Sequence, residues 1–170
     1  MKTQIKTLFA TGLIAVAMST STVYANVSTA KIPSSAVNIT AIQKIIVTGN
    51  VNVTIVQAPK SKVLYQKENN ADVTVKKNNN SITIDGGNAS TAAEVTIYVD
   101  DIYRIDASGN AMVQTKGDFA VRNLQVFVKD HAKVEVNAQT ESLYTVIKDT
   151  AELRLQRIIL RITLFIKIVS

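Results

Sequence analysis

The stretch Ile105-Asp106-Ala107-Ser108-Gly109-Asn110-Ala111-Met112-Val113 decides the fold class, because it sets a small polar corner between two runs of alternating apolar residues. Similar phrases stand at residues 46–53, 126–134 and 144–153. The corner residues Gly109, Asp130 and Asp149 follow one another at intervals of 21 and 19 residues. Glycine adopts left-handed backbone angles without penalty, and aspartate can bond its own backbone, so both residue types suit tight corners.

A period of about 20 residues with one apolar face per coil predicts a β-solenoid or parallel β-helix. Ala111, Ala132 and Ala151 each follow a corner by two residues and would form a column if each coil lies on the previous one. One coil cannot bury its face alone, so stability must come from stacking. The alternative fold is a β-sandwich, which also uses short strands at intervals of about 8–12 residues.

The rest of the body alternates with period two, which is typical of half-buried strands and not of helices. Apolar residues alternate with polar ones at 51–55, 73–75, 82–84, 95–99, 134–136 and 153–155. The Asn-rich segment Lys76–Ser81 separates two of these runs and predicts a hairpin turn. No window between Lys44 and Leu155 has a helical stripe of apolar residues. We therefore expect an all-β domain.

The first 25 residues are typical of a secretory signal peptide. Lys2 and Lys6 precede an apolar run of about a dozen residues, which is shorter than the ~20 that a membrane span needs. Val23-Tyr24-Ala25 then forms a cleavage site of the A-x-A type. We expect cleavage after Ala25 and export to the periplasm, the outer-membrane surface or the extracellular space.

Composition excludes several classes of chemistry. The chain of 170 residues has no cysteine and one histidine, so disulfides, Cys-ligated zinc, iron–sulfur clusters and a thiol nucleophile are excluded. The net charge of +6 comes mainly from the two ends, because residues 26–156 carry 14 basic and 13 acidic residues. This balance, together with export, argues against a nucleic-acid partner.

The polar residues form no convincing site, and we assign no catalytic, cofactor-binding or metal-ligating residue and expect no cofactor. His131 fills the corner position that Asn50, Asn110 and Thr150 fill elsewhere, so it is interpreted as a turn residue. Asp100, Asp101 and Asp106 cluster near Arg104. Paired carboxylates could cleave glycosides or bind calcium, but solvated acids are ordinary at a junction between strands.

The order of the phrases resembles the GIN domain, the head domain of auto-transporter adhesins in secreted Bacteroidetes proteins. The resemblance rests on Lys44–Ile55, the hairpin around Lys76–Ser81, the strand Val95–Val99 and Ile105–Ala111 with its later echoes. It implies a right-handed parallel β-helix-like fold outside the inner membrane and adhesion as the function. Asp100-Asp101 stands where the family usually has a proline, and the repeats stop early.

The resulting division of the chain is a signal peptide at 1–25, an extended linker at 26–43, a GIN-like domain at 44–156 and an atypical apolar tail at 157–170. Arg161 and Lys167 interrupt the apolar tail, so it does not predict a membrane span. Three interpretations stay open: a last strand that caps the solenoid, an amphipathic membrane-facing segment, and the end of a domain truncated by loss of the reading frame.

The first functional hypothesis is a non-enzymatic secreted or surface module, an adhesin head that presents a strand face to a protein or glycan. Candidate contact residues are exposed positions such as Asn52, Thr54, Lys133, Glu135 and Arg154. The second is a polysaccharide-active enzyme on a β-helix scaffold, and the third is an envelope-structural protein that self-associates through residues 157–170. The sequence identifies neither the ligand nor the oligomeric state.

Overall fold

The computed structural model describes residues 35–38, 41–65, 73–88 and 90–169. The predicted signal peptide and most of the predicted linker lie outside the described residues. The strands are β1 Ser35–Asn38, β2 Lys44–Thr48, β3 Val51–Gln57, β4 Lys62–Tyr65, β5 Thr74–Asn78, β6 Ser81–Asp85, β7 Ala93–Val99, β8 Arg104–Ala107, β9 Met112–Lys116, β10 Phe119–Val128, β11 Lys133–Lys148 and β12 Glu152–Val169. The described residues contain no helix, which confirms the all-β prediction.

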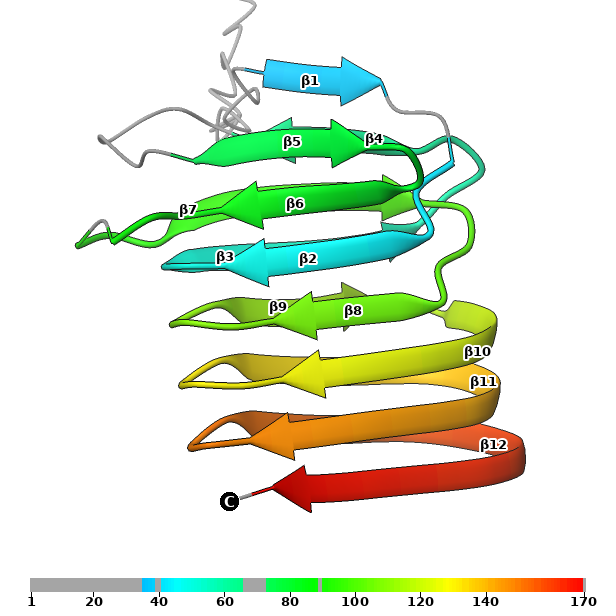
Figure 1. Ribbon diagram of the computed structural model, residues 1–170. Coiled ribbons are helices and arrows are strands. Elements are labelled where there is room, and N and C mark those ends of the chain that lie inside the picture. The colour runs from blue at the N-terminus through cyan, green and yellow to red at the C-terminus, as the bar shows by residue number, and fades with distance from the viewer. Residues whose placement is uncertain (1–34, 39–40, 66–72, 89, 170) are drawn as a thin grey trace, which may run out of the picture. The chain divides into compact units, whose positions relative to one another are not determined.

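All twelve strands belong to one open, strongly curled sheet (Figure 1). On one side β2 pairs in parallel with β6 and β8, and on the other β3 pairs in parallel with β7 and β9. The long strand β11 joins the two sides, because Lys133–Glu135 pair with β9 while residues 138–147 pair with β10. This parallel pairing differs from a β-sandwich, whose sheets are antiparallel.

The spatial order of the coils differs from their order in the chain. We expected each coil to lie on the previous one, but β2–β3 lies between β6–β7 and β8–β9. Ile45 is therefore the register partner of both Ile82 and Ile105. The chain between β3 and β6 supplies the antiparallel strands β4 and β5, which pair with β7 and β6 at the N-terminal end of the sheet. From β10 onward the coils stack in sequence order.

The core consists of the inward-facing residues of both sides of the curled sheet. Ile45, Ile82, Ile105 and Val126 form one column across four strands, and each is 0 % exposed. Burial of each such side chain stabilises the fold by about 1.5–3 kcal/mol relative to exposure. The alanines predicted to form a column are Ala111 and Ala132, which are fully buried, and Ala151, which packs partly buried against the core.

The predicted hairpin is present. Strands β5 and β6 pair antiparallel, and Asn79 in the turn between them has a φ of +50°. Two further strands lie in segments without a clear alternating pattern. Strand β1 falls within the range expected to be an extended linker, and β12 continues through residues 157–169. The backbone of the apolar tail thus extends the last coil of the sheet.

The three predicted corners adopt left-handed backbone angles, as does Gly49 in the similar phrase at residues 46–53. The φ values are +76° at Gly49, +71° at Gly109, +61° at Asp130 and +58° at Asp149. Neighbouring corners touch, because a Cβ on Gly109 would lie 2.9 Å from the nitrogen of Gly49. Their backbones also bond across coils: His131 N donates to Gly109 O at 3.1 Å, and Thr150 N donates to Asp130 O at 3.1 Å.

Candidate functional site

One outer side of the sheet carries all five residues expected to contact a partner, of which Lys133 and Arg154 are exposed and the other three are half-buried. We call it the polar face: the outward side chains of β7, β3, β9 and the first parts of β11 and β12. Its expected contact residues are Asn52, Thr54, Lys133, Glu135 and Arg154. Parallel pairing in register brings them together, because residues at equivalent positions of neighbouring coils become neighbours on the surface.

The side chains of the polar face largely bind one another. Asn52 Nδ2 donates to Glu94 Oε1 at 2.7 Å, and Gln114 Nε2 donates to Thr54 Oγ1 at 3.0 Å. Further along the same face, Glu152 lies 3.1 Å from the Lys133 ammonium and 3.7 Å from the Arg154 guanidinium, and Gln156 Nε2 donates to Glu135 Oε1 at 2.6 Å. A ligand here would have to displace these contacts.

The opposite outer side is apolar and basic. We call it the aromatic face: the outward side chains of β2, β8 and the last parts of β10, β11 and β12. The guanidinium carbon of Arg104 lies 3.9 Å from the ring centroid of Phe127, a cation–π distance. The rings of Phe127 and Tyr144 are 5.8 Å apart between centroids, tilted by 52°. Phe165 is the register partner of Tyr144 and is 58 % exposed.

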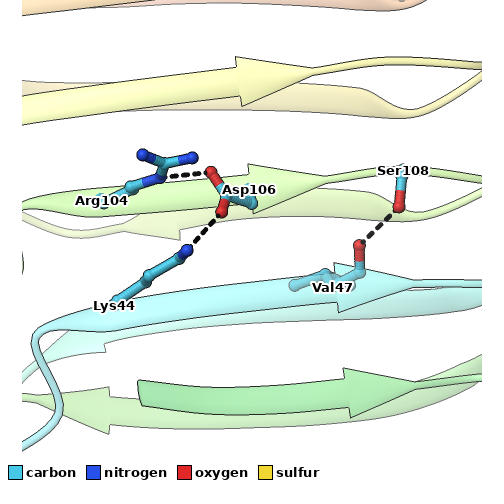
Figure 2. A network of polar contacts seen from close by, with 5 residues as sticks. All are labelled: Lys44, Val47, Arg104, Asp106 and Ser108. Carbon is cyan, nitrogen blue, oxygen red and sulfur yellow. Dashed lines mark hydrogen bonds and ion pairs between the residues drawn. The ribbon is translucent and has the colours of Figure 1, made fainter. Parts of the chain in front are cut away.

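A polar network holds the Arg104 end of the aromatic face in place (Figure 2). Asp106 accepts a hydrogen bond from Arg104 Nε at 2.7 Å and pairs with the Lys44 ammonium at 3.0 Å. Beside it, Ser108 Oγ lies 3.5 Å from the carbonyl oxygen of Val47. One carboxylate thus orients two cations from neighbouring strands, and it fixes the guanidinium that lies over Phe127.

A hollow of about 370 Å³ lies in the aromatic face. Its apolar lining includes Ile46, Phe127 and Val146, and its basic lining is Arg104, Lys129 and Lys148. Asp106 is the single carboxylate in this lining. Within the described part of the chain, neither Lys129 nor Lys148 forms a salt bridge. The hollow therefore combines an aromatic surface with cations that are available to a ligand.

The sequence did not predict the aromatic face, because its members occupy different positions in the phrase. Phe127 precedes its corner, Asp130, by three residues, whereas Tyr144 precedes Asp149 by five. Their contact is diagonal between β10 and β11, where Phe127 is the register partner of Val146. The sequence did contain one signal: in successive strands, aromatic residues occupy alternating positions that face outward and are otherwise mostly polar.

The structure separates the acidic residues that looked clustered in the sequence. Asp106 belongs to the network on β8, whereas Asp100 and Asp101 are exposed in the connection from β7 to β8. Asp101 lines a second hollow of about 360 Å³ together with Arg122 and Glu141, at the bend of the sheet. Arg122 Nε and Glu141 Oε2 in this hollow are 3.9 Å apart.

His131 is exposed at the corner between β10 and β11, where its backbone N–H donates to the carbonyl oxygen of Gly109 in the preceding corner. Among the described residues, no three His, Cys, Asp or Glu side chains are grouped so that they could hold a metal ion. A search of the same residues finds no helix of sufficient length and apolarity to cross a membrane.

Comparison with known proteins identifies both a family and a fold. The family described as "Putative auto-transporter adhesin, head GIN domain" matches residues 41–159. Among solved structures, the fold is similar to a putative adhesin from Parabacteroides merdae (14 % identity, TM-score 0.62, covering 73 % of this chain and 55 % of that one). It is also similar to a putative lipid binding protein (9 %, 0.53, 73 % and 59 %) and a putative adhesin (16 %, 0.51, 73 % and 64 %), both from Parabacteroides distasonis.

At these identities the likeness concerns the fold alone. The chain spans 55–64 % of the lengths of these three proteins. No curated protein matches the chain. The adhesin and binding-protein names of the structural neighbours belong to those proteins, and they are not names of enzymes.

Proposed function

The chain belongs to the family described as "Putative auto-transporter adhesin, head GIN domain", and we propose that it is a non-enzymatic, exported module that binds an acidic glycan on the aromatic face. Export by the signal peptide at 1–25, with cleavage after Ala25, is part of the proposal, as is a right-handed β-helix-like architecture for residues 44–156. The parallel, in-register pairing of β2, β6 and β8 supports that architecture.

The observation that carries the proposal is the hollow formed by Phe127, Val146 and the basic residues Arg104, Lys129 and Lys148. An aromatic ring offers a flat apolar surface to the C–H face of a sugar ring. Ammonium and guanidinium groups attract carboxylates and sulfates, and guanidinium can bind them with two hydrogen bonds. An aromatic ring beside basic side chains therefore suits a polysaccharide whose sugar rings carry negative charges.

The polar face suits a ligand less well. Its hollow, of about 330 Å³, is lined by two glutamates as well as by Lys133 and Arg154. Glu152 already pairs with both Lys133 and Arg154, and Glu135 accepts a hydrogen bond from Gln156. Binding there would exchange existing contacts for new ones, whereas Lys129 and Lys148 of the aromatic face form no ion pair within the described residues. The aromatic face is therefore our candidate, in place of the residues expected from sequence.

The test is binding to immobilised polygalacturonate, with neutral dextran as the comparison polymer. We expect binding to polygalacturonate that weakens as salt rises, because screening reduces the attraction between exposed charges. Phe127→Ala should weaken it about tenfold, the loss expected of about 1.4 kcal/mol of stacking. The matched control is Met112→Ala, because Met112 is also exposed, at 49 %, but lies on the polar face. Equal binding to dextran would contradict the proposal.

The same samples test the non-enzymatic part of the proposal. We expect no new reducing ends after prolonged incubation with the polymer. Release of reducing ends that depends on Asp101 and Glu141, the carboxylates of the hollow at the bend, would instead indicate a polysaccharide-active enzyme.

A further inference from the structure

The last strand, β12, has a long edge without a partner. Its 18 residues pair with β11 on one side, and within the described residues no strand pairs with its other side. Ile166 and Ile168 are the register partners of Thr145 and Ile147, yet they are 52 % and 75 % exposed, because no strand among the described residues lies beyond β12. The last coil thus exposes both backbone hydrogen-bonding groups and apolar side chains.

The other end of the sheet is built differently. It ends in the short strands β1, of four residues, and β5, of five residues, which pair antiparallel with their neighbours. Lys76 and Lys77 on β5 are exposed. Short strands and lysines are the usual protection of a sheet edge against pairing with another chain. This protection at one end makes the 18-residue edge at the other end the candidate interface.

We propose that two copies of the chain pair through β12, antiparallel and about a twofold axis. The strand follows both sides of the curled sheet, and its register with β11 shifts on either side of the pairs Gln139–Ile159 and Thr140–Leu160, which marks the bend. A twofold axis through this bend, between Ile159 and Leu160, places the first part of β12 in one copy against the last part in the other. A twofold interface uses the same surface in both copies and therefore closes the assembly at a dimer.

The backbone hydrogen-bonding groups agree with this register, in which Leu153 faces Ile166 of the second copy. The N–H of Glu152 donates to Ala132 O in the sheet, so the groups of Leu153 point to the free edge, because successive residues of a strand alternate. In the last part of β12, Phe165 is the register partner of Tyr144, which in turn is the register partner of Gln125. Gln125 N donates to Tyr103 O in the preceding strand, so the backbone groups of Phe165 likewise point to β11. The groups of Ile166 therefore also point to the free edge.

The side chains select this register over its neighbours. With Leu153 opposite Ile166, both side chains face the interior, and Glu152 stands opposite Lys167 on the outside. A shift by two residues keeps the inward pairs but places Arg154 opposite Lys167, where two like charges repel. In the proposed register Arg154 instead faces the exposed ring of Phe165, a favourable partner for a guanidinium. In the dimer, Glu152 of each copy therefore faces Lys167 of the other copy.

Cysteine cross-linking tests the register directly, because the chain contains no cysteine of its own. Glu152 and Lys167 would form a pair without backbone hydrogen bonds, in which side chains of antiparallel strands come closest. We expect the double variant Glu152→Cys/Lys167→Cys to form a covalent dimer on oxidation. The matched controls are the two single variants and Glu152→Cys/Val169→Cys, which should stay largely uncross-linked.

Charge reversal tests the pairing without new covalent chemistry. In light scattering coupled to size exclusion, we expect twice the mass of one chain. Lys167→Glu should raise the dissociation constant of the dimer about tenfold, since it replaces two attractions by two repulsions. Adding Glu152→Gln should recover part of the dimerisation, because it removes the repulsion from Glu152 without placing a third cation beside Lys133 and Arg154. Lys148→Glu, one strand away from the edge, should change the dimerisation little.

Three results would overturn the proposal, and none depends on the glycan. A monomer at all concentrations would remove the interface. Open-ended aggregates would contradict a closed twofold pair. A dimer that Lys167→Glu weakens and Glu152→Gln does not strengthen again, or one that cross-links equally well through Val169→Cys, would contradict the register.

Discussion

The carboxylate of Asp130 accepts a hydrogen bond from the backbone N–H of Gly109 at 2.9 Å, across 21 residues of sequence. The relationship repeats one corner later, where Asp149 Oδ2 lies 3.3 Å from Asp130 N. Each aspartate therefore has two tasks. It adopts a left-handed φ at its own corner, and its side chain satisfies the backbone N–H of the corner in the previous coil. This explains how aspartate can replace glycine along the column.

The first prediction concerns Asp130. Asp130→Ala should lower the free energy of unfolding by about 1–3 kcal/mol, because it removes the acceptor of the Gly109 N–H and places alanine at a left-handed φ. Asp130→Asn should cost less than half as much, since asparagine tolerates that φ and keeps a side-chain oxygen. Urea denaturation measures both. A free energy of unfolding unchanged in Asp130→Ala would show that the hydrogen bond contributes nothing.

The second prediction concerns three glycines that share a left-handed φ but differ in their surroundings. A Cβ at Gly49 would lie 2.5 Å from Gly87 O and one at Gly109 would lie 2.9 Å from Gly49 N, whereas one at Gly117 meets nothing within 4 Å. Alanine at Gly117 should cost only the backbone strain, about 1–2 kcal/mol. Alanine at Gly109, and still more at Gly49, should destabilise further, as measured by thermal and urea denaturation. A loss at Gly117 as large as that at Gly49 would contradict close stacking of the corners.

The third prediction concerns Gln57, whose side chain ties three segments together at the end of β3. Its Nε2 donates to Asp100 O at 2.9 Å and to Ala120 O at 2.8 Å, and its Oε1 accepts from Ala120 N at 2.8 Å. Gln57→Ala should lower the free energy of unfolding by about 1.5–3 kcal/mol, because three hydrogen bonds are lost. Hydrogen exchange should speed up at Ala120. Gln114→Ala, which loses one exposed bond to Thr54, is the control with a smaller expected effect.

The fourth prediction concerns the core at the bend. Phe119, at 1 % exposure, is among the largest fully buried side chains. Phe119→Ala should destabilise the fold by about 3–5 kcal/mol, through lost burial and the cavity that remains. The control is Met112→Ala, on the exposed side of β9, which should change the free energy of unfolding by less than about 0.5 kcal/mol. Similar urea midpoints for the two variants would mean that Phe119 is not in the core.

Much of the local structure could be predicted from the sequence. The alternation of apolar and polar residues predicted the inward-facing side chains of β3, which are Val51, Val53 and Ile55, because a half-buried strand requires that alternation. The corners at Gly109 and Asp130 were recognisable because only a few residue types accept a left-handed φ. These features depend on residues close together in the chain, so a short stretch of sequence is enough to predict them.

Features that depend on distant residues could not be predicted. The place of β2 between β6 and β8 follows from the excursion through β4 and β5, which no periodicity records. Thr115 is buried because its hydroxyl both donates to Asn137 O and accepts from Asn137 N, and Gln57 is held by Ala120 and Asp100. The aromatic face likewise needs the register between β10 and β11. The sequence therefore predicted that a strand face binds a partner, but the residues it indicated lie on the polar face, where the side chains bond to one another.

Titration of the labelled protein with oligogalacturonate, followed by amide and side-chain NMR, shows which face binds. Binding on the aromatic face predicts progressive chemical-shift changes at Arg104, Phe127 and Lys148, with Asn52 and Lys133 unchanged. Shifts confined to Asn52, Lys133 and their neighbours on the polar face, or no shifts at all, would contradict it.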